Sequence, residues 1–285
     1  MLVRLKDRLR RHIARLPRRG TTPSWRHSCQ LLERHGFRPN VVFDIGVAYG
    51  TFELYQAFPK AFYHLIDPTP ESLHHMHLLQ QQLNCQIHQV ALGDRDGEAD
   101  IEIRSDIQAA TMLEDTTERE VLRHDRVPMR RLDRLIDDFD RPSLCKIDVQ
   151  GAELMVLEGM TGCLGSMDAV IVETSTIASL KGGPEVHDIV RFMHRHDFVV
   201  ADILGMVRRP LDDATAQLDL LFLPRNSPMR ADRRWCGSSW PVDKATARSL
   251  IMGIGTGFEA RKSRLESPAN AHIRDWRSPV PMLGR

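Results

Sequence analysis

Asp44, Gly46 and Gly50 have types and a spacing that suit a ligand-binding turn. They follow residues 41–43, which are apolar and favour β-structure, so the stretch predicts a buried parallel strand that ends in a tight turn and opens a helix. Glycine at such a turn lets the backbone approach bound atoms closely. The carboxylate of Asp44 can either accept hydrogen bonds from the ligand or hold the turn. The first chemistry that the sequence suggests is therefore the binding of a small ligand at a strand end.

A second acid is spaced to bind the ribose of such a ligand. The apolar run of residues 61–66 predicts another strand, and Asp67 follows it, twenty-one positions after Gly46. A carboxylate about 20 residues past a glycine turn suits ribose hydroxyls. The turn lacks the G-x-G-x-x-G pattern and the Lys-Ser/Thr pair that phosphate binding requires. A ligand with ribose but no pyrophosphate fits better, and S-adenosylmethionine is such a ligand.

Charged residues near the ends of two later strand patterns are further candidates. Lys146 and Asp148 fall in the pattern of residues 144–149 and point to the same face. Burying a lysine and an aspartate in a central strand is costly unless they are paired or used, so they form either a structural ion pair or part of the site. Glu173 ends the next apolar run, residues 169–174. The acids are therefore expected to meet at one edge of the sheet.

The elements that must position these residues alternate between strands and helices. Strands are predicted at residues 41–45, 61–66, 85–94, 144–149, 169–174, 198–204 and 216–223. Helices are predicted at residues 25–35, 51–58, 70–83, 132–139, 152–163 and 184–196. The last strand follows a link too short for a helical crossover and should be antiparallel. The pattern predicts a doubly wound α/β fold.

Two stretches interrupt this alternation. Residues 98–104 alternate loosely after Gly97 and predict an extra strand at the edge. Residues 105–125 are polar and rich in acids. They form either a mobile lid or substrate loop or a plain surface excursion.

Several motifs in these stretches resemble those of the FkbM family of S-adenosylmethionine-dependent methyltransferases. The resemblance covers about residues 40–225 and is carried by V-F-D-I-G at 42–46, D-P at 67–68, V-A-L-G-D at 90–94, R-L-D-R-L-I at 131–136, Q-L-D-L-L-F at 217–222 and, most specifically, K-I-D-V-Q-G-A-E with V-L-E-G at 146–159. It implies a class I, Rossmann-like methyltransferase fold: a seven-stranded, mostly parallel sheet with its last strand antiparallel and helices on both faces. It also implies, as a rule, O-methylation of a hydroxyl on a sugar, glycan or natural product.

Carried onto this sequence, the family's cofactor site falls at the predicted strand ends. The resemblance implies that Asp44 and Gly46 surround the methionine part of the cofactor and that Asp67 binds its ribose. It implies that three residues lie near the adenine: Ala91, Leu92 and Asp94. Asp148 and Glu153 would border the cofactor and the acceptor. One departure is Val47-Ala48, where the family commonly has Ala-Asn, and it weakens any claim about side-chain contacts from this loop.

A methyl acceptor of this kind would need its hydroxyl aligned and deprotonated. Methyl transfer from a sulfonium is an in-line displacement, so alignment is the enzyme's main task. A base that removes the hydroxyl proton typically contributes 10²- to 10⁴-fold. We expect Asp148 to be that base or to orient the acceptor, with Glu173 as the second choice and Lys146 setting the charge of Asp148.

Other functions share some of these features. A nicotinamide oxidoreductase would need the three-glycine phosphate turn, which is absent. A non-catalytic methyltransferase-fold module that acts through its basic termini is the alternative, although Asp44, Asp67 and Asp148 speak against it. Nucleic acid is not an expected partner, because no target-base motif such as Asn-Pro-Pro-Tyr occurs. His74 and His77 would share a helix face, but no third ligand is visible, so no metal site is predicted.

The two ends of the chain differ from its middle. The 285 residues carry a formal net charge of +1, yet basic residues gather at both ends. We expect three parts: residues 1–39, a basic helix and a lead-in helix; residues 40–225, the methyltransferase-like domain; and residues 226–285, an extension rich in Arg, Pro and Gly. The apolar stripe of the first helix would contact an anionic membrane, a partner or its own domain.

The sequence also bears on the compartment. Its five cysteines are scattered without a C-x-x-C pair, which suggests reduced thiols in a cytosolic protein. No apolar run reaches the roughly 18 residues that span a bilayer. The charged N-terminus lacks the apolar core of a secretory signal. A cytoplasmic location is therefore expected, whereas the oligomeric state cannot be read from the sequence.

Overall fold

A computed structural model of the protein describes residues 23–114 and 120–234. The described residues up to Asp232 belong to one unit. The predicted N-terminal helix and most of the C-terminal extension lie outside the described residues. The division at residues 39 and 225 therefore stays a prediction.

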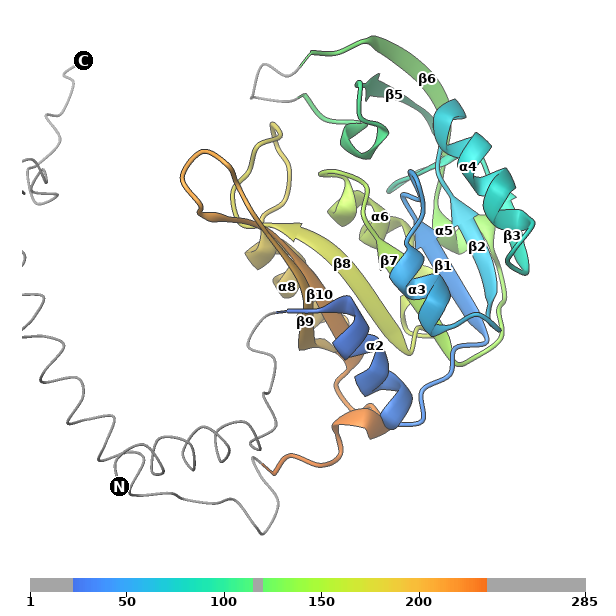
Figure 1. Ribbon diagram of the computed structural model, residues 1–285, viewed down its shortest axis with the longest axis vertical. Coiled ribbons are helices and arrows are strands. Elements are labelled where there is room, and N and C mark those ends of the chain that lie inside the picture. The colour runs from blue at the N-terminus through green and yellow to red at the C-terminus, as the bar shows by residue number, and fades with distance from the viewer. Residues whose placement is uncertain (1–22, 115–119, 235–285) are drawn as a thin grey trace, which may run out of the picture. The chain divides into compact units, whose positions relative to one another are not determined.

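Seven strands form one sheet in the order β3-β2-β1-β7-β8-β10-β9 (Figure 1). The strands are β1 (Val41–Ile45), β2 (Phe62–Ile66), β3 (Cys85–His88), β7 (Ser143–Ile147), β8 (Ala169–Ser175), β9 (Phe198–Arg208) and β10 (Thr215–Pro224). The neighbouring strands β3, β2, β1, β7 and β8 run parallel to one another. Strand β10 runs antiparallel to both β8 and β9. The predicted fold class, a mostly parallel seven-stranded sheet whose last strand is antiparallel, is confirmed.

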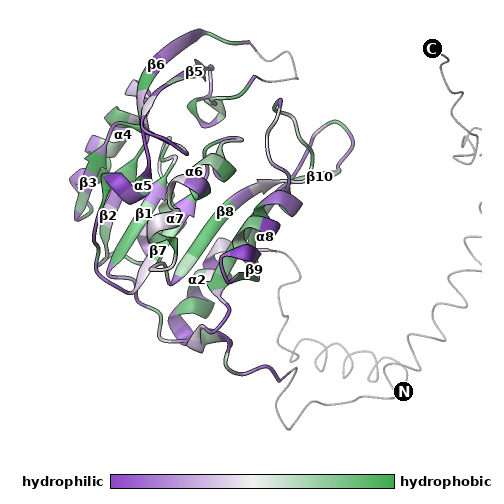
Figure 2. Cartoon of the chain, turned by 180° about the vertical axis from the view of Figure 1, so that it is seen from behind, coloured by the Kyte–Doolittle hydropathy of each residue, from purple (hydrophilic) through white to green (hydrophobic). Residues whose placement is uncertain are grey.

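Helices cover both faces of this sheet. One face packs on α2 (Trp25–Arg34), α3 (Phe52–Ala57) and α4 (Pro70–Gln80). The other packs on α5 (Leu132–Leu135), α6 (Glu153–Gly159), α7 (Thr161–Leu164) and α8 (Val186–Arg195). Strands β1 and β7 are buried at all five positions, as is typical of central strands in a parallel sheet, although they also carry Asp44 and Lys146. Figure 2 shows β1 and β8 coloured as hydrophobic between these helices.

Two predicted helices are shorter than expected. The helix predicted over residues 152–163 divides at Met160 into α6 and α7. Gly159 and Gly162 flank this break, and glycine weakens a helix interior. The helix predicted over residues 132–139 ends at Leu135, because Ile136 is extended.

A second, smaller sheet was not predicted. It has the order β4-β6-β5, from β4 (Ala91–Leu92), β6 (Arg123–Arg130) and β5 (Gly97–Ile103). The strand predicted over residues 85–94 is therefore two strands in two sheets. The extra strand predicted at the edge of the main sheet pairs with β6 instead, and the two share a small core around Ile101, Val127 and Met129. Pro128 lies in β6, and proline in a strand pattern argues against a strand assignment from sequence.

Within residues 23–114 and 120–234, no helix is both long and apolar enough to cross a bilayer.

A pair of histidines, the buried His64 and the half-buried His88, links β2 to the edge strand β3. His64 stacks on Phe43 with ring centroids 5.0 Å apart, and its Nδ1 lies 3.0 Å from Nε2 of His88. Burial, together with His88, lowers the pKa of His64 to about 4. The folded state therefore holds His64 neutral, whereas the unfolded state protonates it below about pH 6.5.

This pair predicts a loss of stability in mild acid. Between pH 6.5 and 4 the unfolded state binds more protons at this position, so stability falls as the pH falls. For a pKa of about 4 in the folded state, the loss at pH 5 should be about 2 kcal/mol relative to pH 7. His64→Phe should flatten this dependence in urea unfolding at the two pH values, whereas His77→Phe, at an exposed position, should not. Equal slopes in the wild type and His64→Phe would contradict the prediction.

Candidate functional site

A cavity of about 340 Å³ lies where the loops after β1, β2 and β7 converge with β8 and β10. This is the carboxyl edge of the parallel strands, where ligands bind in open α/β sheets. The segment between β5 and β6, which includes the short 3₁₀ helix η1 (Ile107–Ala109), lines the same cavity. Residues 106–112, a part of the polar stretch 105–125, therefore line the cavity.

Eight of the eleven predicted site residues line the cavity: Gly46, Gly50, Asp67, Ala91, Leu92, Lys146, Asp148 and Glu173. The other three do not line it: Asp44, Asp94 and Glu153. These eight residues come from five different strands or loops. The cavity therefore brings together the glycine turn, the predicted ribose acid and the acids at the strand ends.

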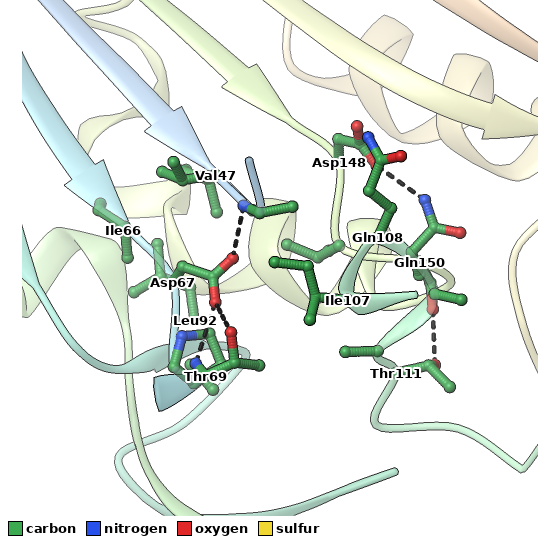
Figure 3. A pocket seen from close by; sticks show the side chains of 18 of the residues that line it. Val47, Ile66, Asp67, Thr69, Leu92, Ile107, Gln108, Thr111, Asp148 and Gln150 are labelled. Carbon is green, nitrogen blue, oxygen red and sulfur yellow. Dashed lines mark hydrogen bonds between the residues drawn. The ribbon is translucent and has the colours of Figure 1, made fainter. Parts of the chain in front are cut away.

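Asp67 is fixed at one end of the cavity. Its Oδ1 accepts hydrogen bonds from the backbone N–H of Thr69 at 2.9 Å and from the Thr69 hydroxyl at 2.7 Å, and its Oδ2 accepts one from the Ala48 N–H at 3.0 Å (Figure 3). Thr69 also caps α4, where Pro70 occupies the first turn. The loop after β2 thus aims the carboxylate at the turn after β1. Its contact with a ribose stays a prediction.

An apolar wall adjoins Asp67. Ile66, Val90, Leu92 and Ile107 line the cavity. In Figure 3, Ile66 and Leu92 lie next to Asp67, and Ile107 of η1 lies between Asp67 and Gln150. Ala91 and Leu92 are buried. This part of the cavity can hold a flat apolar group such as a nucleobase, because it offers side chains without charge next to a ribose-binding carboxylate.

Asp44 lies beneath the turn and holds it. Its side chain is fully buried and accepts hydrogen bonds from the Tyr55 hydroxyl and, at 3.1 Å, from the Thr51 hydroxyl. Burial and the charge of Asp44 raise the pKa of Tyr55, so that the hydroxyl stays protonated and donates. Of the two roles that the sequence allows for Asp44, this geometry corresponds to holding the turn.

Lys146 joins the first and fourth parallel strand ends. Its Nζ donates to the Gly46 carbonyl at 2.8 Å and lies 3.4 Å from carboxylate oxygens of both Asp44 and Asp148. Burial alone would lower the pKa of Lys146, but the carboxylates of Asp148 and Asp44 outweigh it and raise the pKa above its ordinary value. The ammonium group therefore stays charged and balances the acids around it.

Glu173 is the other acid at this end of the cavity. Its Oε2 accepts hydrogen bonds from the side-chain amides of Gln150, at 2.8 Å, and Gln217, at 3.0 Å. Burial, together with the charges of Asp148 and Asp219, raises the pKa of Glu173 to about 9. At neutral pH it is therefore a carboxylic acid that can donate a hydrogen bond.

Asp94 and Glu153 lie outside the cavity lining. The Asp94 side chain pairs with Arg95 at 3.1 Å. Glu153 is buried and accepts a hydrogen bond from the Gly151 N–H at 2.9 Å, so it shapes the loop after β7. Burial raises the pKa of Glu153 to about 7. Their contacts with a cofactor stay predictions.

Sequence reasoning missed the residues that surround the acids. Gln150 stands inside the most specific motif but carries no charge, and Gln217 reaches Glu173 only through the antiparallel pairing of β10 with β8. Ile107 and Thr111 line the cavity because the segment between β5 and β6 of the small sheet lies beside it. Only Gln150 could have been found from its position, between Asp148 and Gly151.

Two non-glycine residues of the cavity have left-handed backbones. Ala48 has a φ of 46° and Gln150 a φ of 52°. Such residues cost of order 1–3 kcal/mol and gather at functional sites. Both residues lie in the loops that follow β1 and β7, the two strands that the Lys146 side chain connects.

The profile of the methyltransferase FkbM domain matches residues 44–200, more than half of the chain. The chain therefore belongs to the FkbM methyltransferase family, as its motifs predict. The predicted cofactor, S-adenosylmethionine, agrees with this family. No curated protein sequence matches the chain.

Solved structures that are similar to parts of this chain include several methyltransferases. Methyltransferase FkbM from Methylobacillus flagellatus KT has a TM-score of 0.44 and 16% identity, over 70% of this chain and 48% of that one. Magnesium protoporphyrin IX methyltransferase from Synechocystis PCC 6803 with bound SAM has a TM-score of 0.41 and 12% identity, over 70% and 79%. The chain thus spans about half the length of the first of these proteins.

Among residues 23–114 and 120–234, no group of three or more His, Cys, Asp or Glu side chains is placed to hold a metal ion.

Proposed function

We propose that the protein is an S-adenosylmethionine-dependent methyltransferase that methylates a hydroxyl of a sugar, glycan or natural product. One observation carries the proposal: a single cavity holds a ribose-type carboxylate at one end and a pair of acids with a buried lysine at the other, in a chain of the FkbM family. A cytoplasmic location, and contact of the N-terminal helix with a membrane or partner, belong to the same proposal.

The cavity residues fit the proposed cofactor. Asp67 would accept hydrogen bonds from the ribose hydroxyls, since its carboxylate lines the cavity and is held by Thr69 and Ala48. The apolar wall around Leu92 and Ile107 would hold the adenine. Gly46, which has a φ of 78°, lets the backbone approach the methionine part. When bound, S-adenosylmethionine supplies the methyl group.

Asp148 is the proposed base for the acceptor hydroxyl. Its side chain is about one-third exposed at the cavity, with Lys146 3.4 Å from one carboxylate oxygen. The ammonium group of Lys146 thus lies beside the proposed base and offers a positive charge next to it. Glu173, which is protonated at neutral pH, would donate a hydrogen bond to the acceptor instead of removing its proton.

Calorimetric titration with S-adenosylhomocysteine tests the cofactor site. The wild type should bind it and should not bind NAD. Asp67→Ala should weaken binding by about 10- to 100-fold, because it removes a charged hydrogen-bond acceptor for the ribose. Asp137→Ala, at an exposed position away from the cavity lining, should bind as the wild type does. Failure of the wild type to bind would favour the non-catalytic module.

Asp148→Asn separates binding from catalysis in the same assay. It should bind S-adenosylhomocysteine as the wild type does. In a screen of glycan and lipid-linked hydroxyls with methyl-labelled cofactor, it should transfer methyl groups about 10²- to 10⁴-fold more slowly. Turnover at the wild-type rate would remove Asp148 from the role of base.

A further inference from the structure

One side-chain amide joins the two acids at the acceptor end of the cavity. Nε2 of Gln150 donates one hydrogen bond to Asp148 Oδ1 at 2.9 Å and the other to Glu173 Oε2 at 2.8 Å. The two N–H groups of an amide nitrogen are thereby both used. The distance between the two carboxyl groups is set by a group that cannot ionise.

The backbone of the same residue contacts residues 104–114, the described segment that follows β5 and lines part of the cavity; we call it the covering segment. The Gln150 carbonyl accepts a hydrogen bond from the Thr111 hydroxyl at 2.7 Å (Figure 3). At the neighbouring Gly151, an added Cβ would lie 3.1 Å from Leu113 and 2.5 Å from Leu180, so the loop after β8 meets the covering segment there. Gln150 thus lies where the acids and the cover of the cavity meet.

Gln150 keeps this position at a cost in backbone strain. Its φ of 52° is unfavourable for a residue with a Cβ atom and favourable for glycine. Glycine would satisfy the backbone better but would lose the amide. A strained residue whose side chain makes two specific contacts points to a role for that side chain.

We propose that Gln150 is a positioning residue that holds the carboxyl groups of Asp148 and Glu173 in a fixed arrangement beneath the covering segment. The inference rests on the proposed function, which gives the two acids their roles beside the acceptor. Asp148 removes the proton and Glu173 donates a hydrogen bond, and Gln150 acts through both without touching the methyl group.

The contact between Gln150 and Glu173 can be measured through the pKa of Glu173, because this pKa responds to the groups around it. Asp148, Asp219, Glu153 and Lys146 all face it, and their charges act together with burial. An N–H donor stabilises the ionised form of a carboxyl group, so loss of the Gln150 amide should raise the pKa of Glu173 further. Asp148 loses the same donor, so the ¹³C chemical shift of its carboxyl group should change. Loss of Gln217, which donates to Glu173 and not to Asp148, should affect Glu173 alone.

The test compares Gln150→Gly with the wild type by ¹³C NMR titration of labelled Asp and Glu carboxyl groups. We expect the titration of Glu173 to move upward by about half to one pH unit and the carboxyl chemical shift of Asp148 to change, because both groups lose a hydrogen-bond donor. Gln217→Leu should move the titration of Glu173 and leave the chemical shift of Asp148 unchanged. An unchanged titration of Glu173 together with an unchanged chemical shift of Asp148 in Gln150→Gly would overturn the proposal.

Thermal unfolding separates this role from a purely structural one. Gln150→Gly should unfold at or above the wild-type temperature, because glycine relieves the strain. Asp213→Gly is the matched control, since Asp213 has a φ of 61° at an exposed site away from the cavity lining. It should change neither the titration of Glu173 nor the chemical shift of Asp148. A markedly less stable Gln150→Gly would make the residue structural and overturn the proposal.

Binding of S-adenosylhomocysteine distinguishes the two proposals. Gln150→Gly should bind it within about threefold of the wild type, because the amide faces the acids and not Asp67. Failure of the wild type to bind would overturn the proposed function, whereas the carboxyl titrations would still decide whether Gln150 positions the acids.

Discussion

Replacing Lys146 with methionine should lower the free energy of unfolding by about 3–5 kcal/mol, the usual result of removing one partner of a buried ion pair. The Lys146 side chain is 6% exposed and that of Asp44 is fully buried. Tyr55 and Thr51 would still donate to Asp44, but they are neutral and cannot balance its charge. The variant would leave a buried carboxylate without its cation.

Urea unfolding at pH 7 measures this effect, and two further variants interpret it. Adding Asp44→Asn to Lys146→Met should recover much of the lost free energy of unfolding, because the unpaired buried carboxylate is then replaced by a neutral amide. Lys181→Met removes an exposed lysine that pairs with Glu114 at 2.8 Å, and it should cost at most about 1 kcal/mol. A loss below about 1 kcal/mol in Lys146→Met would mean that Asp44 does not depend on this cation.

The pairing of Lys146 with Asp44 shows what the sequence could and could not predict. Apolar runs marked β1 and β7 correctly, because both strands are buried on both faces. The ion pair arises from the register of these strands, which sets Asp44 directly beside Lys146. Register between strands about a hundred residues apart leaves no local pattern, so the sequence placed Lys146 near Asp148 but not on Asp44.

The covering segment and the small sheet show the same limit. The strand pairing of β5 with β6 crosses a connection of some twenty residues and includes Pro128, so neither the partner nor the separate sheet was evident. Once this sheet forms, it brings Ile107 and Thr111 to the cavity. The strand-end acids could be predicted because parallel strands share one carboxyl edge. Of their neutral partners, Gln150 could be found only from its position in the motif, and Gln217 could not be found, because it reaches Glu173 through the antiparallel pairing of β10 with β8.

Gly46 should be the least replaceable residue of the turn. A Cβ atom added there would lie 1.7 Å from the carbonyl oxygen of Asp148 and 2.8 Å from its carbonyl carbon. These are backbone atoms, so no side chain can move aside. Gly46→Ala must therefore push apart the tips of β1 and β7, where Lys146 donates to the Gly46 carbonyl.

The expected result for Gly46→Ala is a loss of more than about 3 kcal/mol in the free energy of unfolding, together with at least a 100-fold loss of S-adenosylhomocysteine binding. Gly36→Ala separates strain from contact. Gly36 has a φ of 79°, nearly that of Gly46, but nothing lies within 4 Å of its added Cβ. It should cost only about 1 kcal/mol and leave binding unchanged. If the two variants lost equal stability, backbone strain alone would explain the glycine, and the close approach of the β1 and β7 tips would not shape the cofactor site.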